Sequence, residues 1–241
     1  MNMVRMFCVF VATLAVMASV ARAQTSHVVD ELKSGRDQTI VVFGTSLTQG
    51  GAWPKQVETW LNGLGHKGKA TVLNKGLSGS DTQSHGLRHL DRDVIALKPD
   101  VVFVEFGMND CIQRDGDKEP KVPLEKFKEN LGTIVDRIRK EVPKAEIILL
   151  TMNPAADSEK TPNSGKFRAA LLDYYEAVRG IGKTKKLLVI DTYAAWKEVD
   201  AARVKRLIPD GVHPSAAGNE AVTTPAIKAA LTHDGQAKGA P

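Results

Sequence analysis

Short apolar runs alternate with amphipathic segments along this chain of 241 residues. The runs are continuous rather than alternately apolar and polar, which is typical of strands buried on both faces of a parallel sheet. We expect five strands, at 39–44, 70–74, 101–106, 146–151 and 187–191. Apolar residues at helical spacing predict helices at 53–64, 82–97, 123–141, 164–181 and 215–231. The last helix is expected to begin at an N-cap, Ser215. This order predicts an α/β fold with an open parallel sheet covered on both faces.

An open parallel sheet places its functional site beyond the carboxyl ends of the strands. Glycines and polar residues gather at three such ends, in the segments GTSLTQGG (44–51), KGLSGSD (75–81) and GMND (107–110). A fourth polar segment, DGVHP (210–214), follows the last predicted strand and puts an aspartate and a histidine three positions apart. Each segment alone also fits an ordinary turn or helix cap, because serine and glycine favour both.

Together the four segments suit one mechanism. Ser46 is the candidate nucleophile and His213 the base that takes its proton. Asp210 is the candidate partner that orients the imidazole and stabilises the imidazolium. The oxyanion of a tetrahedral intermediate would be held by the backbone N–H groups of Ser46 and Gly76 and by the side-chain amide of Asn109.

The same four blocks resemble those of the SGNH hydrolases, also called the GDSL lipase/acylhydrolase family. FGTSLTQG, NKGLSG, FGMND and DGVHP occur in the family's order, and the resemblance covers residues 43–214. It implies a three-layer α/β/α sandwich with five parallel strands, like that of flavodoxin, and a carboxylic ester hydrolase without a cofactor. The chain departs from the family in one place, since Thr45 stands where the family usually has aspartate. That aspartate is not a triad member, so the mechanism is expected to be preserved.

The N-terminal segment of the chain predicts export. Residues 1–23 combine Arg5, an apolar run of about 15 residues and a terminal Ala21-Arg22-Ala23, as a secretory signal peptide does. The alternative, a membrane anchor, needs roughly 20 apolar residues. We therefore expect a secreted or periplasmic protein, cleaved near Ala23, with one domain over residues 24–241 and a polar tail from about residue 233. The net charge of +5 is small and dispersed, and it favours neither nucleic acid nor a membrane surface as partner.

Other residues in these segments offer competing chemistry. Ser78 and Ser80 are alternative nucleophiles in the second glycine-rich segment. His85 and His89 lie four apart on a predicted helix and would share a face, yet we interpret them as a solvated surface rather than a metal site. Cys111 has no histidine placed against it by any motif and is expected to be structural. No cofactor and no metal ligand set are expected.

Three other classes of function remain to be compared. A flavodoxin-like carrier would use the first loop to hold a flavin phosphate, but it would leave Asn109 and DGVHP without a role. A phosphate-binding P-loop is excluded, because its second glycine would fall on Gln49. A binding module without catalysis is the third. For an ester hydrolase, the expected substrate is an O-acetylated carbohydrate, with short-chain acyl esters, thioesters or lysophospholipids as the alternative. The sequence predicts no particular oligomeric state.

Overall fold

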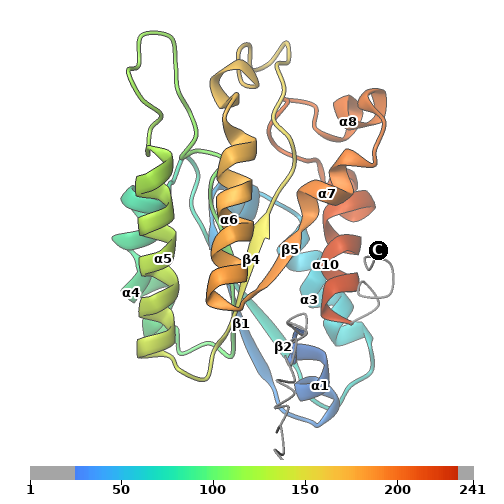
Figure 1. The fold of residues 1–241 in the computed structure, drawn as a ribbon. Helices are drawn as coiled ribbons and strands as arrows, with labels where there is room; N and C mark the ends of the chain where they lie inside the picture. The colour runs from blue at the N-terminus through green and yellow to red at the C-terminus, as the bar shows by residue number, and fades with distance from the viewer. Residues whose placement is uncertain (1–24, 233–241) are drawn as a thin grey trace, which may run out of the picture.

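A computed structural model describes residues 25–232, and it has the predicted five-stranded sheet. The strands are β1 (Gln38–Gly44), β2 (Ala70–Gly76), β3 (Val101–Glu105), β4 (Glu146–Thr151) and β5 (Leu188–Asp191). Their order is β2-β1-β3-β4-β5, and every pair is parallel. The central strand β3 is buried along its whole length, whereas the edge strands β2 and β5 are partly exposed. The expected class, a three-layer α/β/α sandwich, is confirmed (Figure 1).

Helices cover both faces of the sheet. They are α1 (Val28–Lys33), α2 (Ser46–Gln49), α3 (Trp53–Gly63), α4 (Leu90–Asp93), α5 (Leu124–Glu141), α6 (Leu171–Lys185), α7 (Thr192–Lys197), α8 (Ala201–Leu207), α9 (Ala216–Gly218) and α10 (Thr224–Leu231). Helices α5 and α6 pack side by side over one face, and α3 packs with α10 on the other (Figure 1). From β1 the chain continues to β2 at one edge of the sheet, whereas from β3 it continues towards β5 at the other edge. Because each crossover is right-handed, α3 lies on one face of the sheet and α5 and α6 lie on the other.

The helix expected over 82–97 is broken into three pieces. A π-helical turn spans Thr82–Leu87, α4 follows, and a 3₁₀ turn covers Ile95–Leu97. The π turn arises because the N–H of Gly86 reaches back five residues to the carbonyl of Asp81, at 3.0 Å. Gly86 also packs so tightly against α5 that a Cβ atom would lie 2.8 Å from Ile134 Cδ1. Tertiary packing, rather than local periodicity, therefore determines the backbone conformation of this segment.

Two further segments expected as single helices are also divided into shorter pieces. The segment expected as a helix over 164–181 contains a 3₁₀ turn, Lys166–Arg168, and then α6, which ends before Lys186 in the left-handed region at φ 52°. The segment 215–231 is α9, a π turn at Asn219–Thr223 and α10. Ser215 is confirmed as its N-cap, since its Oγ accepts the N–H of Gly218 at 3.1 Å.

The predicted signal peptide, residues 1–23, and the polar tail from about residue 233 lie outside the described residues. Within residues 25–232, no helix is long and apolar enough to cross a membrane.

Candidate active site

Ser46 lies two residues beyond the end of β1, as the first residue of the short helix α2. The preceding residue, Thr45, is the N-cap, and its Oγ1 accepts the N–H of Leu47 at 3.2 Å. Ser46 Oγ is 2.8 Å from His213 Nε2. The hydroxyl donates this hydrogen bond when Nε2 carries no proton, which is the arrangement that a base-activated serine needs.

The other ring nitrogen of His213 faces Asp210. Nδ1 is 2.6 Å from Asp210 Oδ2, so an Nδ1–H tautomer donates to the carboxylate. The second oxygen, Oδ1, accepts the backbone N–H groups of Val212 and His213 at 2.9 and 2.7 Å. Burial alone would raise the pKa of Asp210, but these N–H donors and the imidazole lower it below its usual value. Asp210 is therefore ionised at neutral pH and fixes the ring orientation.

The turn that carries Asp210 and His213 depends on Gly211. Its φ is +77°, and a Cβ atom there would lie 2.0 Å from the carbonyl oxygen of Ala156. The close approach allows the N–H of Ala156 to donate to the carbonyl of Gly211 at 2.8 Å. Hydrogen bonding to the segment after β4 thereby holds the turn.

A residue that the sequence reasoning missed also supports this turn. Asn153, just beyond β4, is fully buried, and its Nδ2 donates to the carbonyl of Val212 at 2.7 Å. Tyr175 from α6 donates its hydroxyl to the carbonyl of Asn153 at 3.1 Å. No sequence motif contains Asn153. Its position just beyond the carboxyl end of a strand, where open parallel sheets usually carry their functional site, is the one signal that could have identified it.

The second glycine-rich segment forms a tight turn beside Ser46. The N–H of Ser80 donates to the carbonyl of Leu77 at 3.2 Å, and Gly79, at the third position, has φ +70°. This is the pattern of a type II turn. The N–H of Leu77 and the Oγ of Ser80 both donate to the carbonyl of Gly44, at 3.0 and 3.2 Å. The turn is thus attached to the last residue of β1, two positions before the serine.

The structure gives the two glycines of this segment different roles. The N–H of Gly76 donates to Asn74 Oδ1 at 3.0 Å, so it is already occupied. A Cβ atom on Gly76 would lie 2.4 Å from the backbone nitrogen of Gln49, which explains the glycine by close packing against α2. The N–H of Gly79, in contrast, has no acceptor among residues 25–232.

Asn109 approaches this turn from the loop after β3. It is buried, and its Nδ2 donates to the carbonyl of Ser80 at 2.8 Å, which leaves the second hydrogen of the amide available. The next residue, Asp110, accepts the N–H and hydroxyl of Thr82 and the N–H of Gly107. Burial raises the pKa of Asp110 to about 6 despite these donors. Asp110 thereby fixes the loop on which Asn109 stands.

A buried carboxylate lies directly behind the serine loop. Glu105, at the end of β3, accepts the N–H and the hydroxyl of Thr45, both at 2.9 Å, and the hydroxyl of Thr48 at 2.9 Å. Burial raises the pKa of Glu105 to about 7, although these hydrogen bonds oppose the shift. The sequence reasoning regarded Glu105 as part of an apolar strand.

The competing residues take other roles in the structure. Ser80 is buried and donates to Gly44, and within residues 25–232 no hydrogen bond joins Ser78 or Ser80 to a histidine. The interpretation of His85 as a solvated residue is wrong, since it is 2% exposed and its ring lies 4.8 Å from that of Phe43. Burial raises the pKa of the Cys111 thiol to about 12, which makes it a poor nucleophile. Among residues 25–232, no group of three or more His, Cys, Asp or Glu side chains suits a metal ion.

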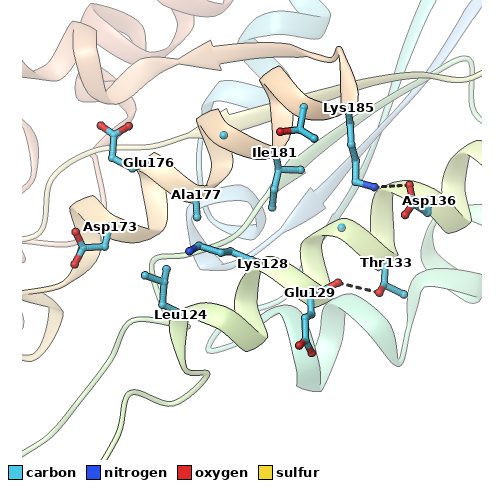
Figure 2. A pocket seen from close by; sticks show the side chains of 13 residues that line it. Leu124, Lys128, Glu129, Thr133, Asp136, Asp173, Glu176, Ala177, Ile181 and Lys185 are labelled. Carbon is cyan, nitrogen blue, oxygen red and sulfur yellow. Dashed lines mark hydrogen bonds and ion pairs between the residues drawn. The ribbon is translucent and has the colours of Figure 1, made fainter.

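The open space beside the serine is small. A pocket of about 170 Å³ lies beside Ser46 and His213, and its other lining residues are Leu47, Gly50, Gly51, Ser78 and Pro214. A larger hollow, of about 880 Å³, lies between α5 and α6 and is shown in Figure 2. Lys185 of α6 donates to Asp136 of α5 across it. Charged side chains line this groove together with Leu124, Ala177 and Ile181, and none of its lining residues is a nucleophile paired with a base.

Similarity to known proteins identifies the family of this chain. The model of the GDSL-like lipase/acylhydrolase family matches residues 42–221, a range that includes every site residue described above. The chain belongs to this family. The resemblance inferred from the four blocks is confirmed, and so is the prediction of a carboxylic ester hydrolase.

The relatives include named esterases. An acetylxylan esterase of Geobacillus stearothermophilus is 34% identical over 157 residues, covering 61% of this chain and 66% of the relative. The isoamyl acetate-hydrolyzing esterase 1 homolog of Bos taurus is 29% identical over 198 residues, covering 76% and 77%. A lipoprotein of Bacillus subtilis, YqeF, is 28% identical, covering 73% and 79%.

Solved structures agree with this grouping. The crystal structure of Axe2, an acetylxylan esterase from Geobacillus stearothermophilus, superposes with a TM-score of 0.69 at 26% identity, covering 83% of this chain and 96% of that one. Catalytic mutants of Axe2 replace a serine, an aspartate or a histidine by alanine, and the aspartate and histidine are three positions apart. The flavodoxin-like carrier and the non-catalytic binding module are therefore set aside in favour of an esterase.

Proposed function

We propose that this protein hydrolyses esters through a Ser46–His213–Asp210 triad. The observation that carries the proposal is the continuous chain of hydrogen bonds from Ser46 Oγ through the imidazole to Asp210 Oδ2, at 2.8 and 2.6 Å. The same three residue types are the subjects of the catalytic mutants of Axe2, at the same spacing of aspartate and histidine.

In the proposed reaction, Ser46 Oγ attacks the ester carbonyl carbon while its proton passes to His213 Nε2. Asp210 stabilises the resulting imidazolium, since its ionised carboxylate already accepts the Nδ1–H. When the tetrahedral intermediate collapses, Nε2 returns the proton to the leaving alkoxide, and the acyl group remains on Ser46. Water then attacks the acyl-enzyme with His213 as base, and the second collapse releases the carboxylic acid.

For the oxyanion hole, we propose the N–H groups of Ser46 and Gly79 and the side-chain amide of Asn109. Gly79 takes the place that the sequence analysis gave to Gly76, because the Gly76 N–H is bound to Asn74. The Gly79 N–H has no acceptor among the described residues, and neither has that of Ser46. Asn109 is held next to this turn because its Nδ2 donates to the carbonyl of Ser80, the residue after Gly79. Donors left without acceptors beside a nucleophile are what a developing oxyanion requires.

For the substrate, we propose an acetyl ester of a carbohydrate. The likeness to an acetylxylan esterase, in both sequence and structure, supports a sugar as the alcohol. The pocket of about 170 Å³ is smaller than the roughly 300–1,000 Å³ of sites for drug-sized ligands, which favours a short acyl group. A short-chain ester of a simple alcohol is the second candidate, because relatives include esterases named for isoamyl acetate. Export to the cell exterior or periplasm remains part of the proposal, resting on residues 1–23.

Two measurements test this function. Ser46→Ala is expected to keep the melting temperature and to lose turnover, leaving only the residual catalysis of the oxyanion hole. Near wild-type activity of this variant, with activity lost in Ser78→Ala, would refute the assignment of the nucleophile. A panel of acetylated xylan, acetylated pectin and p-nitrophenyl esters of rising chain length tests the substrate. Acetate release from polymer and a steep decline beyond four carbons support the first candidate, whereas activity on p-nitrophenyl acetate alone supports the second.

A further inference from the structure

A lysine from a distant part of the chain reaches the turn that carries Gly79. After β3 the chain makes a long loop, and it returns at Lys121, whose N–H donates to the carbonyl of Ile112 at 2.7 Å. The next N–H, that of Val122, donates to the carbonyl of Asp110 at 3.0 Å. The backbone of Lys121 is thereby fixed beside the start of its own loop, close to Asn109.

The side chain of Lys121 makes two charge-assisted contacts. Its Nζ donates to the carbonyl of Gly79 at 2.7 Å and lies 2.8 Å from Asp81 Oδ2. The lysine side chain is 38% exposed and that of Asp81 is 3% exposed, so the carboxylate is shielded from water and the ion pair is weakly screened by salt. Burial raises the pKa of Asp81, but the contacts with Lys121 and Ser84 outweigh it and leave the pKa below its usual value. The carboxylate is therefore charged and holds the ammonium group in place.

Asp81 is itself fixed by the chain that follows it. Its Oδ1 accepts the N–H groups of Gln83 and Ser84 at 2.8 and 2.6 Å, as the N-cap of the π turn. Lys121 thus joins the turn at Gly79 to a carboxylate that has little freedom to move. The neutral contacts of the turn, from Leu77 to Gly44 and from Asn109 to Ser80, lie on either side of Gly79. Among residues 25–232, the hydrogen bond from Lys121 is the one made to Gly79 itself.

We propose that Lys121 is a positioning residue for the oxyanion hole, holding Gly79 through its carbonyl so that the Gly79 N–H stays directed at the reacting oxygen. This inference rests on the proposed function, in which Gly79 is an oxyanion donor. Small displacements of a group that acts on the transition state reduce the rate steeply, whereas the ground-state ester gains little from the same contact. The loss of Lys121 should therefore affect kcat and leave KM nearly unchanged.

The test compares Lys121→Met, Lys121→Arg and Lys118→Met, using a short acetate ester. Lys118 lies in the same loop, is exposed and makes no hydrogen bond or ion pair with residues 25–232, so it is the matched control. We expect Lys121→Met to lower kcat by about 10- to 100-fold with KM within about threefold of the wild type. Lys121→Arg should recover most of the loss, since arginine can donate to both oxygens. Lys118→Met should have the kcat of the wild type.

The inference is overturned if Lys121→Met keeps kcat within about twofold of the wild type. It is also overturned if Lys121→Arg is as slow as Lys121→Met, or if the loss of kcat disappears once each variant is assayed well below its melting temperature. Ser46→Ala is assayed alongside. An active Ser46→Ala refutes the proposed function, whereas an inactive Ser46→Ala with an active Lys121→Met refutes only the role of Lys121.

Discussion

Replacing Gly79 by alanine tests the direction of its backbone N–H while the rest of the turn is preserved. Gly79 has φ +70°, and a Cβ atom added there would meet nothing within 4 Å, so the change introduces no clash. Alanine disfavours this φ by about 1–2 kcal/mol. A type I turn relieves that cost by turning over the peptide between Ser78 and Gly79, which reverses the direction of the N–H. The variant should therefore lose one oxyanion donor while its fold is preserved.

The expected loss in catalysis is much larger than the loss in stability. Removing one oxyanion donor typically costs about 2.7–4 kcal/mol in activation free energy, or roughly 100- to 1000-fold in kcat. The free energy of unfolding should fall by no more than about 1–2 kcal/mol, because the turn can relax. Kinetics with p-nitrophenyl acetate give kcat and KM, and thermal unfolding gives the stability of the same samples.

Gly65 offers a matched control for this experiment. It follows α3, has φ +71°, and a Cβ atom there would also meet nothing within 4 Å. Gly65→Ala should lose a similar amount of stability and keep the kcat of the wild type. The reasoning is refuted if a crystal structure of Gly79→Ala shows the peptide turned over while kcat stays within about twofold of the wild type.

Two other predictions concern the residues around this turn. Asn109→Ala should lower kcat by about 100- to 1000-fold with KM nearly unchanged, and an unchanged kcat would remove Asn109 from the oxyanion hole. Its free energy of unfolding should also fall, by about 1–3 kcal/mol, because the buried carbonyl of Ser80 loses its donor. For Glu105, the raised pKa of about 7 means that the folded protein favours the neutral acid, so stability is full below about pH 4.5 and declines until about pH 7. Chemical denaturation of wild type and Glu105→Gln across this range should show a decline of at most about 3 kcal/mol in the wild type, beyond any that the variant retains. Equal slopes would contradict the raised pKa of Glu105.

The strands could be predicted closely because burial on both faces leaves a direct mark on the sequence. The run at 101–106 consists of apolar residues except Glu105, and the structure buries all of β3. The helix expected at 82–97 failed for the opposite reason. Its π turn depends on the approach of Gly86 to Ile134, some 50 positions away, and periodicity within the segment contains no such information.

The candidate site shows the same division between local and distant information. The motifs located Ser46, Asp210 and His213, since each belongs to a short block of sequence, and the structure brings the three together. The choice between Gly76 and Gly79 was not open to sequence reasoning. Both are glycines of one short segment, and the structure distinguishes them by the hydrogen bond from Gly76 to Asn74 and by the positive φ of Gly79.

Glu105 gives a physical reason for the threonine that replaces the family's usual aspartate. Thr45 donates both its N–H and its hydroxyl to the buried carboxylate, and the serine loop is thereby attached to β3. An aspartate at position 45 would put a second carboxyl group within hydrogen-bonding distance of the first, and two such groups cannot both ionise without strong repulsion. One of them would have to remain protonated, so the geometry of the loop would depend on a shared proton. Threonine donates to Glu105 whether or not that acid is ionised, which keeps Ser46 in place across the range in which Glu105 titrates.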